Sequence, residues 1–278
     1  MCKQNINPII KWAGGKRQLL DRIIERMPES YNHYFEPFVG GGAVLFGLQP
    51  EAATVNDING ELINLYQTIK EQPEGFMEQL TALDSVNCDK EYYYKQRERY
   101  NEKIKAGEHD VELAALFVWL NKHCFNGLYR VNRHGFFNVP YNNKNGSTRS
   151  ADNDNIAAMA SFLQRVKIMQ GDFEASVAEA QAGDFIFFDS PYAPLNATSF
   201  EDYTKEGFAE EEHRRLAELY KALDKKGCYC MLTNHDVPLI RELYADFDIE
   251  VVDVKRLINR NANARTGTEV IITNYQQR

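Results

Sequence analysis

The stretch YFEPFVGGG, residues 34–42, decides the fold. Its first six residues are mostly apolar and aromatic, and three glycines follow at once. A short apolar run that ends in a glycine turn is typical of a buried strand. The run AVLFGL behind the glycines indicates the opening of a helix. We therefore expect a strand over 34–39, a tight turn over 40–42 and a helix after it.

The same alternation of strand and helix recurs on both sides of this stretch. A second strand is expected at ATVND, which ends at Asp57, and ELINLYQTIK behind it has helical spacing. Further strands are predicted at KIMQGDF, DFIFFD, CYCMLTN and IEVVDV, and TEVIITNY alternates as an edge or hairpin strand would. Strands alternating with helices predict an α/β fold with a mostly parallel sheet.

In the middle of the chain the alternation of strand and helix stops. EYYYKQRERYNEKI and DVELAALFVWLNK predict two helices, the second capped by Asp110. A segment rich in Asn, Gly and Arg follows as a loop or hairpin, and NDNIAAMASFLQRV returns to helix. The simplest organisation is a sheet domain of residues 1–63 and 155–278, interrupted by an inserted module over 64–154.

Composition narrows the class of protein. The chain has 278 residues, 44% hydrophobic and 26% charged, which suits one core and a modest second domain. No apolar run approaches the ~20 residues of a membrane span, and the start lacks the apolar region of a secretory signal. Five scattered cysteines indicate a reduced, intracellular chain. We expect a cytoplasmic protein that does not enter a membrane.

The formal net charge of −8 argues at first against a nucleic-acid partner. The charge is segregated, however. Three segments hold no acidic residue and carry +4, +5 and +4 in turn, over residues 1–20, 113–151 and 254–268. Since the local positive potential attracts DNA whatever the total charge, these segments are predicted to contact it.

Three candidate ligand groups follow predicted strands. Ligands of open α/β sheets bind outside the carboxyl ends of the strands. The glycines at 40–42 would let a cofactor approach the backbone, and Asp57 stands where an acid commonly accepts ribose hydroxyls. A tight turn and a helix cap are the plainer alternatives for these two. D-S-P-Y at 189–192 places a carboxylate, a proline and an aromatic ring after an apolar strand.

Several enzyme classes find no support. KWAGGK is not a phosphate-binding loop, because Ile10 and Arg17 occupy the places of its first glycine and its hydroxyl residue. H-E-x-x-H, G-x-S-x-G and paired C-x-x-C motifs are absent. These observations argue against kinases, ATPases, zinc hydrolases and serine hydrolases, and no metal is expected.

Six motifs in order carry a family resemblance: K-W-A-G-G-K at 11–16, F-E-P-F-V-G-G-G at 35–42, D-I-N at 57–59, F-N-G-L-Y-R-V-N at 125–132, F-N-V-P-Y at 137–141 and D-S-P-Y at 189–192. The chain resembles the Dam family of N6-adenine DNA methyltransferases. The resemblance implies a Rossmann-like, S-adenosylmethionine-dependent sheet with an inserted, mainly helical target-recognition domain that carries a β-hairpin. It also implies a flipped-out adenine in double-stranded DNA as substrate, GATC as the site, and a monomer in solution.

The resemblance also assigns roles to residues. The catalytic residues it implies are Asp189, Ser190, Pro191 and Tyr192, although the usual motif is Asp-Pro-Pro-Tyr and Ser190 departs from it. The cofactor-binding residues it implies are Trp12, Lys16, Gly40, Gly42, Asp57, Asp172, Phe173 and Asp189. The DNA-binding residues it implies are Lys11, Phe125, Asn126, Leu128, Arg130, Asn132 and Pro140, and Asn261, Asn263 and Arg265 suggest a further polar loop on the phosphates.

Other readings stay open at this point. A different short adenine-containing site would fit the same motifs. A methyltransferase for an RNA adenine is a rival, against which the FNGLYR segment argues because it favours duplex DNA. An enzyme for protein glutamine usually carries Asn-Pro-Pro-Tyr, which Asp189 disfavours. Ser190 favours a catalytically weak or silent DNA-binding relative. The residues do not distinguish a role in restriction–modification, mismatch repair, gene regulation or a phage.

Overall fold

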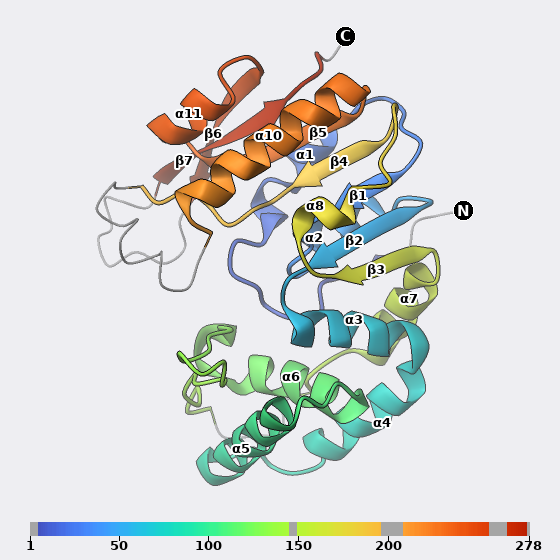
Figure 1. The fold of residues 1–278 in the computed structure, drawn as a ribbon. Helices are drawn as coiled ribbons and strands as arrows, with labels where there is room; N and C mark the ends of the chain where they lie inside the picture. Colours follow the sequence, from blue (N-terminus) through green and yellow to red (C-terminus); the bar gives the residue numbers. More distant parts are fainter. Residues whose placement is uncertain (1–4, 145–148, 196–207, 256–265, 277–278) are drawn as a thin grey trace. The chain divides into compact units, whose positions relative to one another are not determined.

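The computed structural model describes residues 5–144, 149–195, 208–255 and 266–276 (Figure 1). The chain divides into two compact units. The helical unit comprises residues 1–17, 39–49 and 57–170, and the sheet unit comprises residues 18–38, 50–56 and 171–278. The expected division into a catalytic domain and a recognition domain over 64–154 stays a prediction.

Seven strands form one sheet in the order β3-β2-β1-β4-β5-β7-β6. The pairs β1–β2, β1–β4 and β4–β5 are parallel, whereas β5–β7 and β6–β7 are antiparallel. The predicted α/β fold class is therefore confirmed. The strands are β1 Tyr34–Glu36, β2 Ala53–Asp57, β3 Val166–Gln170, β4 Phe185–Phe188, β5 Tyr229–His235, β6 Asp248–Lys255 and β7 Thr266–Thr273.

Two details of the sheet differ from the sequence-based expectation. β1 ends at Glu36 rather than at residue 39, because Pro37 has no N–H with which to continue a ladder. β7 pairs with β6 as a hairpin strand, as expected, but it is not an edge strand, since β5 pairs with its other side. Val270 and Ile271 are both fully buried, which suits an interior strand.

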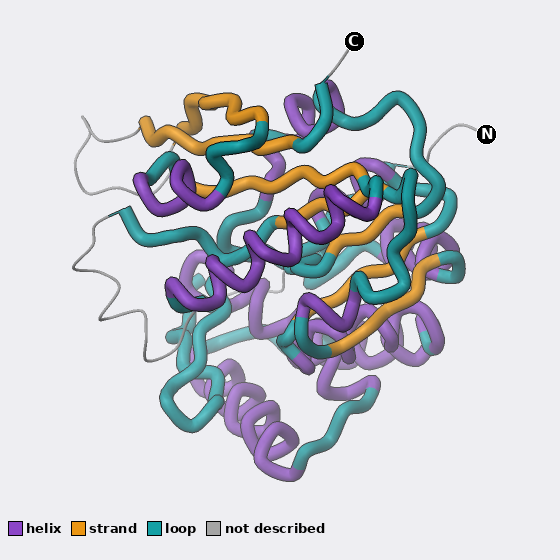
Figure 2. The backbone as a smooth tube through the Cα atoms, turned by 45° about the horizontal axis from the view of Figure 1, so that its top comes forward, coloured by secondary structure: helices purple, strands orange, loops and turns teal. Residues whose placement is uncertain are grey.

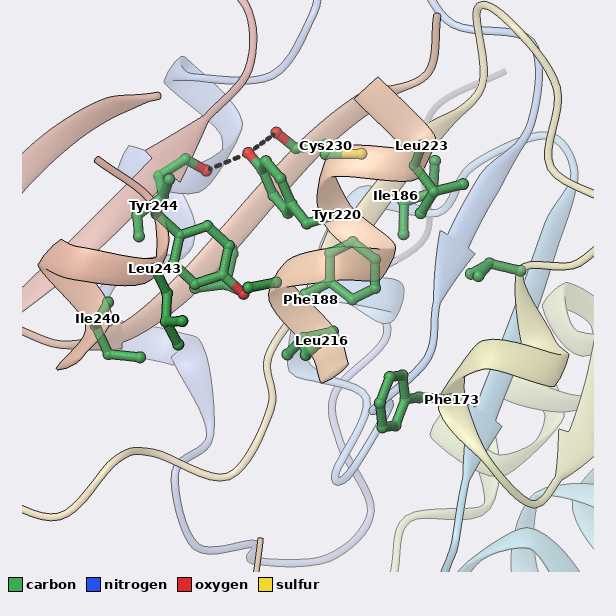
Figure 3. Packing of buried hydrophobic residues seen from close by; sticks show 14 of the residues in the cluster. Phe173, Ile186, Phe188, Leu216, Tyr220, Leu223, Cys230, Ile240, Leu243 and Tyr244 are labelled. Carbon is green, nitrogen blue, oxygen red and sulfur yellow. Dashed lines mark hydrogen bonds between the residues drawn. The ribbon is translucent and has the colours of Figure 1, made fainter. Parts of the chain in front are cut away.

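The core of the sheet unit lies between the strands and α10 Glu210–Lys226, which runs along β4 and β5 (Figures 1 and 2). Figure 3 shows its centre, where Phe188 of β4 meets Leu216 and Tyr220 of α10. The Tyr220 hydroxyl donates a hydrogen bond to the Cys230 carbonyl at 2.8 Å. The other helices of this unit are α1 Leu20–Glu25, α8 Phe173–Ser176 and α11 Pro238–Leu243.

The core of the helical unit is centred on α6 Val111–His123, which packs against α3, α4 and α5. Residues 113–121 of α6 are all buried, as expected for a helix that is apolar on every side. Asp110 caps it, because its Oδ1 accepts from Leu113 N at 2.8 Å. The other helices of this unit are α2 Ala43–Leu48, α3 Gly60–Glu71, α4 Pro73–Asp84, α5 Lys90–Ala106 and α7 Asn153–Leu163.

The segment after α6 begins with the 3₁₀ turn Phe125–Gly127. Antiparallel bridges then join Val131 to Phe137 and Cys124 to Tyr141, so the backbone follows a hairpin path between these residues. The motifs FNGLYRVN and FNVPY lie on its two arms.

Candidate functional site

The glycine turn of the helical unit is packed against the indole of Trp12. A Cβ on Gly40 would lie 2.9 Å from Trp12 Cδ1, and one on Gly41 would lie 2.8 Å from Trp12 Cβ. Gly42 has a φ of +70°, and a Cβ there would meet the Phe46 ring at 2.5 Å. Larger residues are thus excluded both by conformation and by space.

Trp12 is half-buried among aromatic neighbours. Its ring stacks on Tyr129 with a centroid distance of 5.2 Å and an interplanar angle of 24°. The Phe117 ring is nearly perpendicular to it, with a centroid distance of 6.3 Å. Tyr129 was not among the predicted site residues, although it stands inside the FNGLYR motif. Burial raises the pKa of Tyr129 to about 12, so its hydroxyl stays protonated.

Asp57 fastens the glycine turn to the start of α3. Its Oδ2 accepts from Gly40 N at 3.0 Å and its Oδ1 accepts from Asn59 N at 3.0 Å. Burial raises the pKa of Asp57, and these backbone donors oppose the rise. The Tyr66 hydroxyl donates to the Gly40 carbonyl at 2.7 Å, which fixes the turn from its other side.

Lys16 is only 6% exposed. Its ammonium donates to the carbonyl of Gly14 at 2.5 Å, which closes the KWAGGK segment on itself. A buried ammonium group near a glycine-rich backbone is suited to an anionic part of a ligand.

The D-S-P-Y segment belongs to the sheet unit and follows β4 directly. The Asp189 carboxylate is half-buried, and its Oδ1 accepts from the Thr233 hydroxyl at 2.9 Å. Ser190 is 2% exposed, with its hydroxyl 3.5 Å from Asn234 Nδ2. Asn234 Oδ1 accepts from Ala193 N at 2.9 Å and so holds the far end of the segment.

Tyr192 is held by its hydroxyl and by its ring. The hydroxyl donates to Glu269 Oε2 at 2.9 Å, and the ring meets the edge of His235 at 4.8 Å. Burial raises the pKa of Tyr192 well above its ordinary value, and the charges of Asp189 and Glu269 add to the rise. The phenol is therefore neutral and serves as a hydrogen-bond donor.

Thr233, Asn234 and Glu269 are site residues that the sequence analysis missed. Thr233 and Asn234 lie near the end of β5, beside β4, and Glu269 lies on β7 opposite His235. Polar residues at the end of an apolar strand are the pattern that singled out Asp57. The same pattern in CYCMLTN would have indicated Thr233 and Asn234.

Asp172 and Phe173 have structural contacts within the sheet unit. Asp172 caps α8, since its Oδ1 accepts from Glu174 N at 2.9 Å, and it forms an ion pair with Arg215. Phe173 is 4% exposed, with its ring 5.4 Å from that of Phe38. The Arg215 guanidinium lies 4.3 Å from the centre of the Phe173 ring. Their predicted cofactor contact stays a prediction.

The predicted DNA-binding residues include exposed apolar side chains. Phe125 is 51% exposed and Leu128 is 36% exposed, which is unusual for residues of this size beside a buried helix. Asn126 between them is exposed and has a φ of +57°. Pro140 is exposed as well, and its carbonyl accepts from Phe125 N at 2.8 Å.

Arg130 and Asn132 occupy the first arm of the hairpin. Arg130 is exposed, and its Nε donates to Asn138 Oδ1 at 2.7 Å, which orients the guanidinium. The Asn132 side-chain oxygen accepts from the backbone N–H groups of His134 and Phe136. Asn132 therefore shapes the turn, while the exposed Arg130 side chain is tied to Asn138 on the second arm.

Lys11 is exposed, and its backbone is clamped by a residue that the sequence analysis missed. Asn121 Oδ1 accepts from Lys11 N at 2.8 Å, and Asn121 Nδ2 donates to the carbonyls of Lys11 and Gly127 at 3.0 Å each. Gly127 lies so close that a Cβ on it would be 2.5 Å from Lys11 Cδ. The only sign in the sequence was one amide in a helix of apolar residues.

The basic side chains of the 113–151 segment are all exposed where described: Lys122, Arg130, Arg133, Lys144 and Arg149. Lys3 and the predicted loop residues Asn261, Asn263 and Arg265 lie outside the described residues. Within the described ranges, no group of three or more His, Cys, Asp or Glu side chains is placed to hold a metal ion. No helix of those ranges combines the length and apolar character of a membrane span.

Comparison with known proteins gives a consistent family. The D12 class N6 adenine-specific DNA methyltransferase family matches residues 12–258. The type II methyltransferase M1.LlaDCHI of Lactococcus lactis subsp. cremoris is 46% identical, covering 98% of this chain and 97% of its own. The type II methyltransferase M.MjaIII of Methanocaldococcus jannaschii is 40% identical, covering 97% of this chain and 99% of its own.

The DNA adenine methylase of Escherichia coli (strain K12) is 33% identical, covering 96% of this chain and 94% of its own. These three matches span nearly the whole length of each protein, and the family match covers the positions of Trp12, the glycine turn and Asp189. This chain therefore belongs to the D12 class of N6 adenine-specific DNA methyltransferases, enzymes that act on DNA with S-adenosylmethionine as methyl donor.

Proposed function

We propose that this enzyme methylates N6 of an adenine flipped out of double-stranded DNA, within the sequence GATC. The observation that carries the proposal is the Asp189 carboxylate at the end of β4, held by the buried Thr233 hydroxyl. The FNGLYRVN and FNVPY motifs support duplex DNA and GATC, through their resemblance to the Dam family. Similarity to the DNA adenine methylase of Escherichia coli supports an adenine in DNA as the target.

The N6 amino group is a weak nucleophile because its lone pair is delocalised into the adenine ring. Two acceptors aimed at its N–H bonds would draw the nitrogen toward tetrahedral geometry and stabilise the positive charge that develops there. We assign these roles to the Asp189 carboxylate and the backbone carbonyl of Ser190. A serine at 190 retains that carbonyl, so the departure from Asp-Pro-Pro-Tyr keeps the acceptor and loses only the fixed φ of proline.

Tyr192 would stack on the flipped adenine, and Pro191 would stiffen the turn before it. A base inside the duplex is inaccessible to the enzyme. Flipping it out costs about a few kcal/mol of lost stacking and pairing. The bond from the Tyr192 hydroxyl to Glu269 restricts the ring before DNA arrives. A restricted ring has less freedom to lose when it stacks.

The helical unit holds groups that suit the cofactor. The Asp57 carboxylate accepts backbone N–H groups of Gly40, Asn59 and Ile58, and two carboxylate oxygens can accept about four hydrogen bonds, so a ribose hydroxyl can be added. S-adenosylmethionine supplies the methyl group on a sulfonium centre. The Trp12 ring can contact the sulfonium cation or the adenine of the cofactor. The Lys16 ammonium can pair with the carboxylate of its amino-acid part.

The remaining cofactor assignments rest on the resemblance. Gly40 and Gly42 would let the ligand approach the backbone. Asp172 and Phe173 stay candidates for contact with the adenine ring of the cofactor, with the Asp172 carboxylate still paired to Arg215.

Exposed residues of the helical unit would read the DNA. The Arg130 fork matches O6 and N7 of guanine, and Lys11 is the second guanine candidate. Phe125 and Asn126 would enter the stack beside the flipped base, and Leu128 and Pro140 would contact a thymine methyl group. Asn132 would act through the turn that it forms.

The similar type II methyltransferases support a role as the modification enzyme of a restriction–modification system. We expect the enzyme to act in the cytoplasm and as a monomer.

Transfer of a tritiated methyl group to matched duplexes tests the proposal. The first substrate is a duplex that contains GATC, and the second is a duplex in which the same four bases are permuted. The third is a single-stranded oligonucleotide that contains GATC. We expect incorporation into the GATC duplex alone. Equal transfer to the permuted duplex would assign a different site, and transfer to the single strand would overturn the duplex substrate. Cofactor binding without any transfer would indicate a catalytically silent relative.

A further inference from the structure

We propose that Thr233 is a positioning residue, which holds the Asp189 carboxylate in the orientation that methyl transfer requires. The inference rests on the role proposed above for Asp189. It is carried by one contact, the hydrogen bond from Thr233 Oγ1 to Asp189 Oδ1 at 2.9 Å. Thr233 itself is fully buried, with no exposed surface.

The sheet explains why Thr233 reaches this carboxylate. β4 and β5 are parallel, and Phe188 pairs with Leu232, so Asp189 and Thr233 are the next residues along the two strands. A β-branched side chain has few χ1 rotamers, which makes threonine a stiffer donor than serine. The preceding residues Met231 and Leu232 are also fully buried, so Thr233 is the first polar side chain after the apolar part of β5.

The next residue of β5 restrains the other end of the segment. Asn234 Oδ1 accepts from Ala193 N, and His235 Nδ1 lies 2.8 Å from the Ala193 carbonyl oxygen. Residues 189–193 are therefore tethered near both ends to consecutive residues of one strand. This arrangement restricts the backbone around Ser190, where the usual proline is missing.

The expected effect of losing the Thr233 hydroxyl is on rate and not on binding. Without this donor the Asp189 carboxylate loses one of the hydrogen bonds that orient it, so its oxygens are held less tightly in the direction of the amino group. Hydrogen bonds to charged groups are strong enough that their loss slows a dependent step roughly 10- to 100-fold. Neither the cofactor nor the DNA is predicted to touch Thr233, so their dissociation constants should stay within about twofold, since no binding contact is removed.

The experiment compares Thr233→Val, which removes the hydroxyl at constant shape, with Thr233→Ser, which keeps it. Single-turnover methyl transfer to the GATC duplex is measured along with the dissociation constants of S-adenosylmethionine and DNA. The matched control is Thr54→Val, because Thr54 is 4% exposed on β2 and its hydroxyl pairs with His33 Nε2 at 3.0 Å. We expect the single-turnover rate of methyl transfer to fall in Thr233→Val, to stay nearly normal in Thr233→Ser and to be normal in Thr54→Val.

The outcomes separate this inference from the proposed function. If the wild type is active and Thr233→Val transfers the methyl group at the same rate, the positioning role is overturned. A slow Thr233→Val that also binds either ligand weakly overturns it too, because the defect is then not confined to the rate. If Thr233→Val does not fold, Thr233→Ala lacks the same hydroxyl and replaces it in the comparison. A wild type that transfers no methyl group refutes the proposed function instead.

Discussion

The hydroxyl of Tyr192 donates a hydrogen bond to Oε2 of Glu269 at 2.9 Å. The two residues are 77 positions apart and meet because Glu269 pairs with His235 across the antiparallel β5–β7 ladder. The same ladder brings the edge of His235 against the Tyr192 ring. A strand added after the parallel part of the sheet thus orients the aromatic ring that we assign to the flipped base.

Replacing Glu269 should therefore reduce the stacking of the flipped adenine. In Glu269→Ala the Tyr192 hydroxyl loses a charged acceptor, and we expect a loss of roughly 10-fold in methyl transfer, the lower end of the worth of a hydrogen bond to a charged group. Glu269→Gln keeps an acceptor oxygen and should lose less. The fluorescence of 2-aminopurine at the target position measures flipping directly. Equal flipping in wild type and Glu269→Ala would contradict the prediction.

Arg130→Ala should relax discrimination at one guanine of the site. A bidentate arginine–guanine contact discriminates against the wrong base by about 1–3 kcal/mol. The measurement is kcat/KM on the GATC duplex and on duplexes substituted at each guanine. Arg133→Ala is the control, since Arg133 is exposed on the same hairpin. If Arg130→Ala instead weakens binding equally on all sequences, Arg130 is a phosphate contact.

Ser190→Pro should leave turnover similar or raise it. Proline would restore a fixed φ and the usual Asp-Pro-Pro-Tyr sequence, and it keeps the carbonyl that we assign as an acceptor. Within the described part of the chain, the Ser190 hydroxyl has one hydrogen bond to lose, a long contact of 3.5 Å with Asn234 Nδ2. Steady-state turnover on the GATC duplex measures the effect. A large loss of turnover would mean that the serine itself takes part in the reaction.

His213 should make the stability of the protein depend on pH. Burial lowers the pKa of His213 to about 4, below the value of about 6.5 in an unfolded chain. The neutral imidazole therefore contributes its full stability above pH 6.5 or so, and this contribution is lost as pH falls toward about 4. The slope is at most about 1.4 kcal/mol per pH unit for one group.

Urea unfolding between pH 7 and pH 4 measures this dependence, with His213→Leu as the comparison. Leucine removes the titrating group, and His213 Nε2 is buried without a hydrogen-bond partner in the part of the chain that the structure describes. The variant should show a smaller decline in the free energy of unfolding. Identical declines in both proteins would assign the pH dependence to other groups.

The sequence predicted those features that depend on local pattern. Apolar runs ending in glycine or acid predicted β2 and β4 almost to the residue, and Asp110 was recognisable as a cap because capping needs only the next turn. Pro37 was visible too, but the apolar residues beyond it favoured a longer strand. Local pattern thus located the ends of β2 and β4, and with them Asp57 and Asp189.

Features that depend on strand order were not predicted. Nothing in TEVIITNY says that it lies between β5 and β6, so Glu269 could not be paired with Tyr192. Thr233 reaches Asp189 only because β4 and β5 are neighbours in register. Residues that support a site from another strand become visible only when the sheet is known.

Asn121 joins residues that are distant in the sequence, since its bonds to Lys11 cross 110 positions and its bond to Gly127 crosses six. A contact of such long range forms only after the intervening chain has closed, and closing a loop becomes entropically costlier, though slowly, as the loop lengthens. The hairpin that carries FNGLYRVN and FNVPY therefore cannot acquire all its native contacts until the N-terminal segment has returned to it. Removing the first eleven residues would leave the Asn121 amide without the Lys11 backbone, and the end of α6 would have to rearrange or unfold locally.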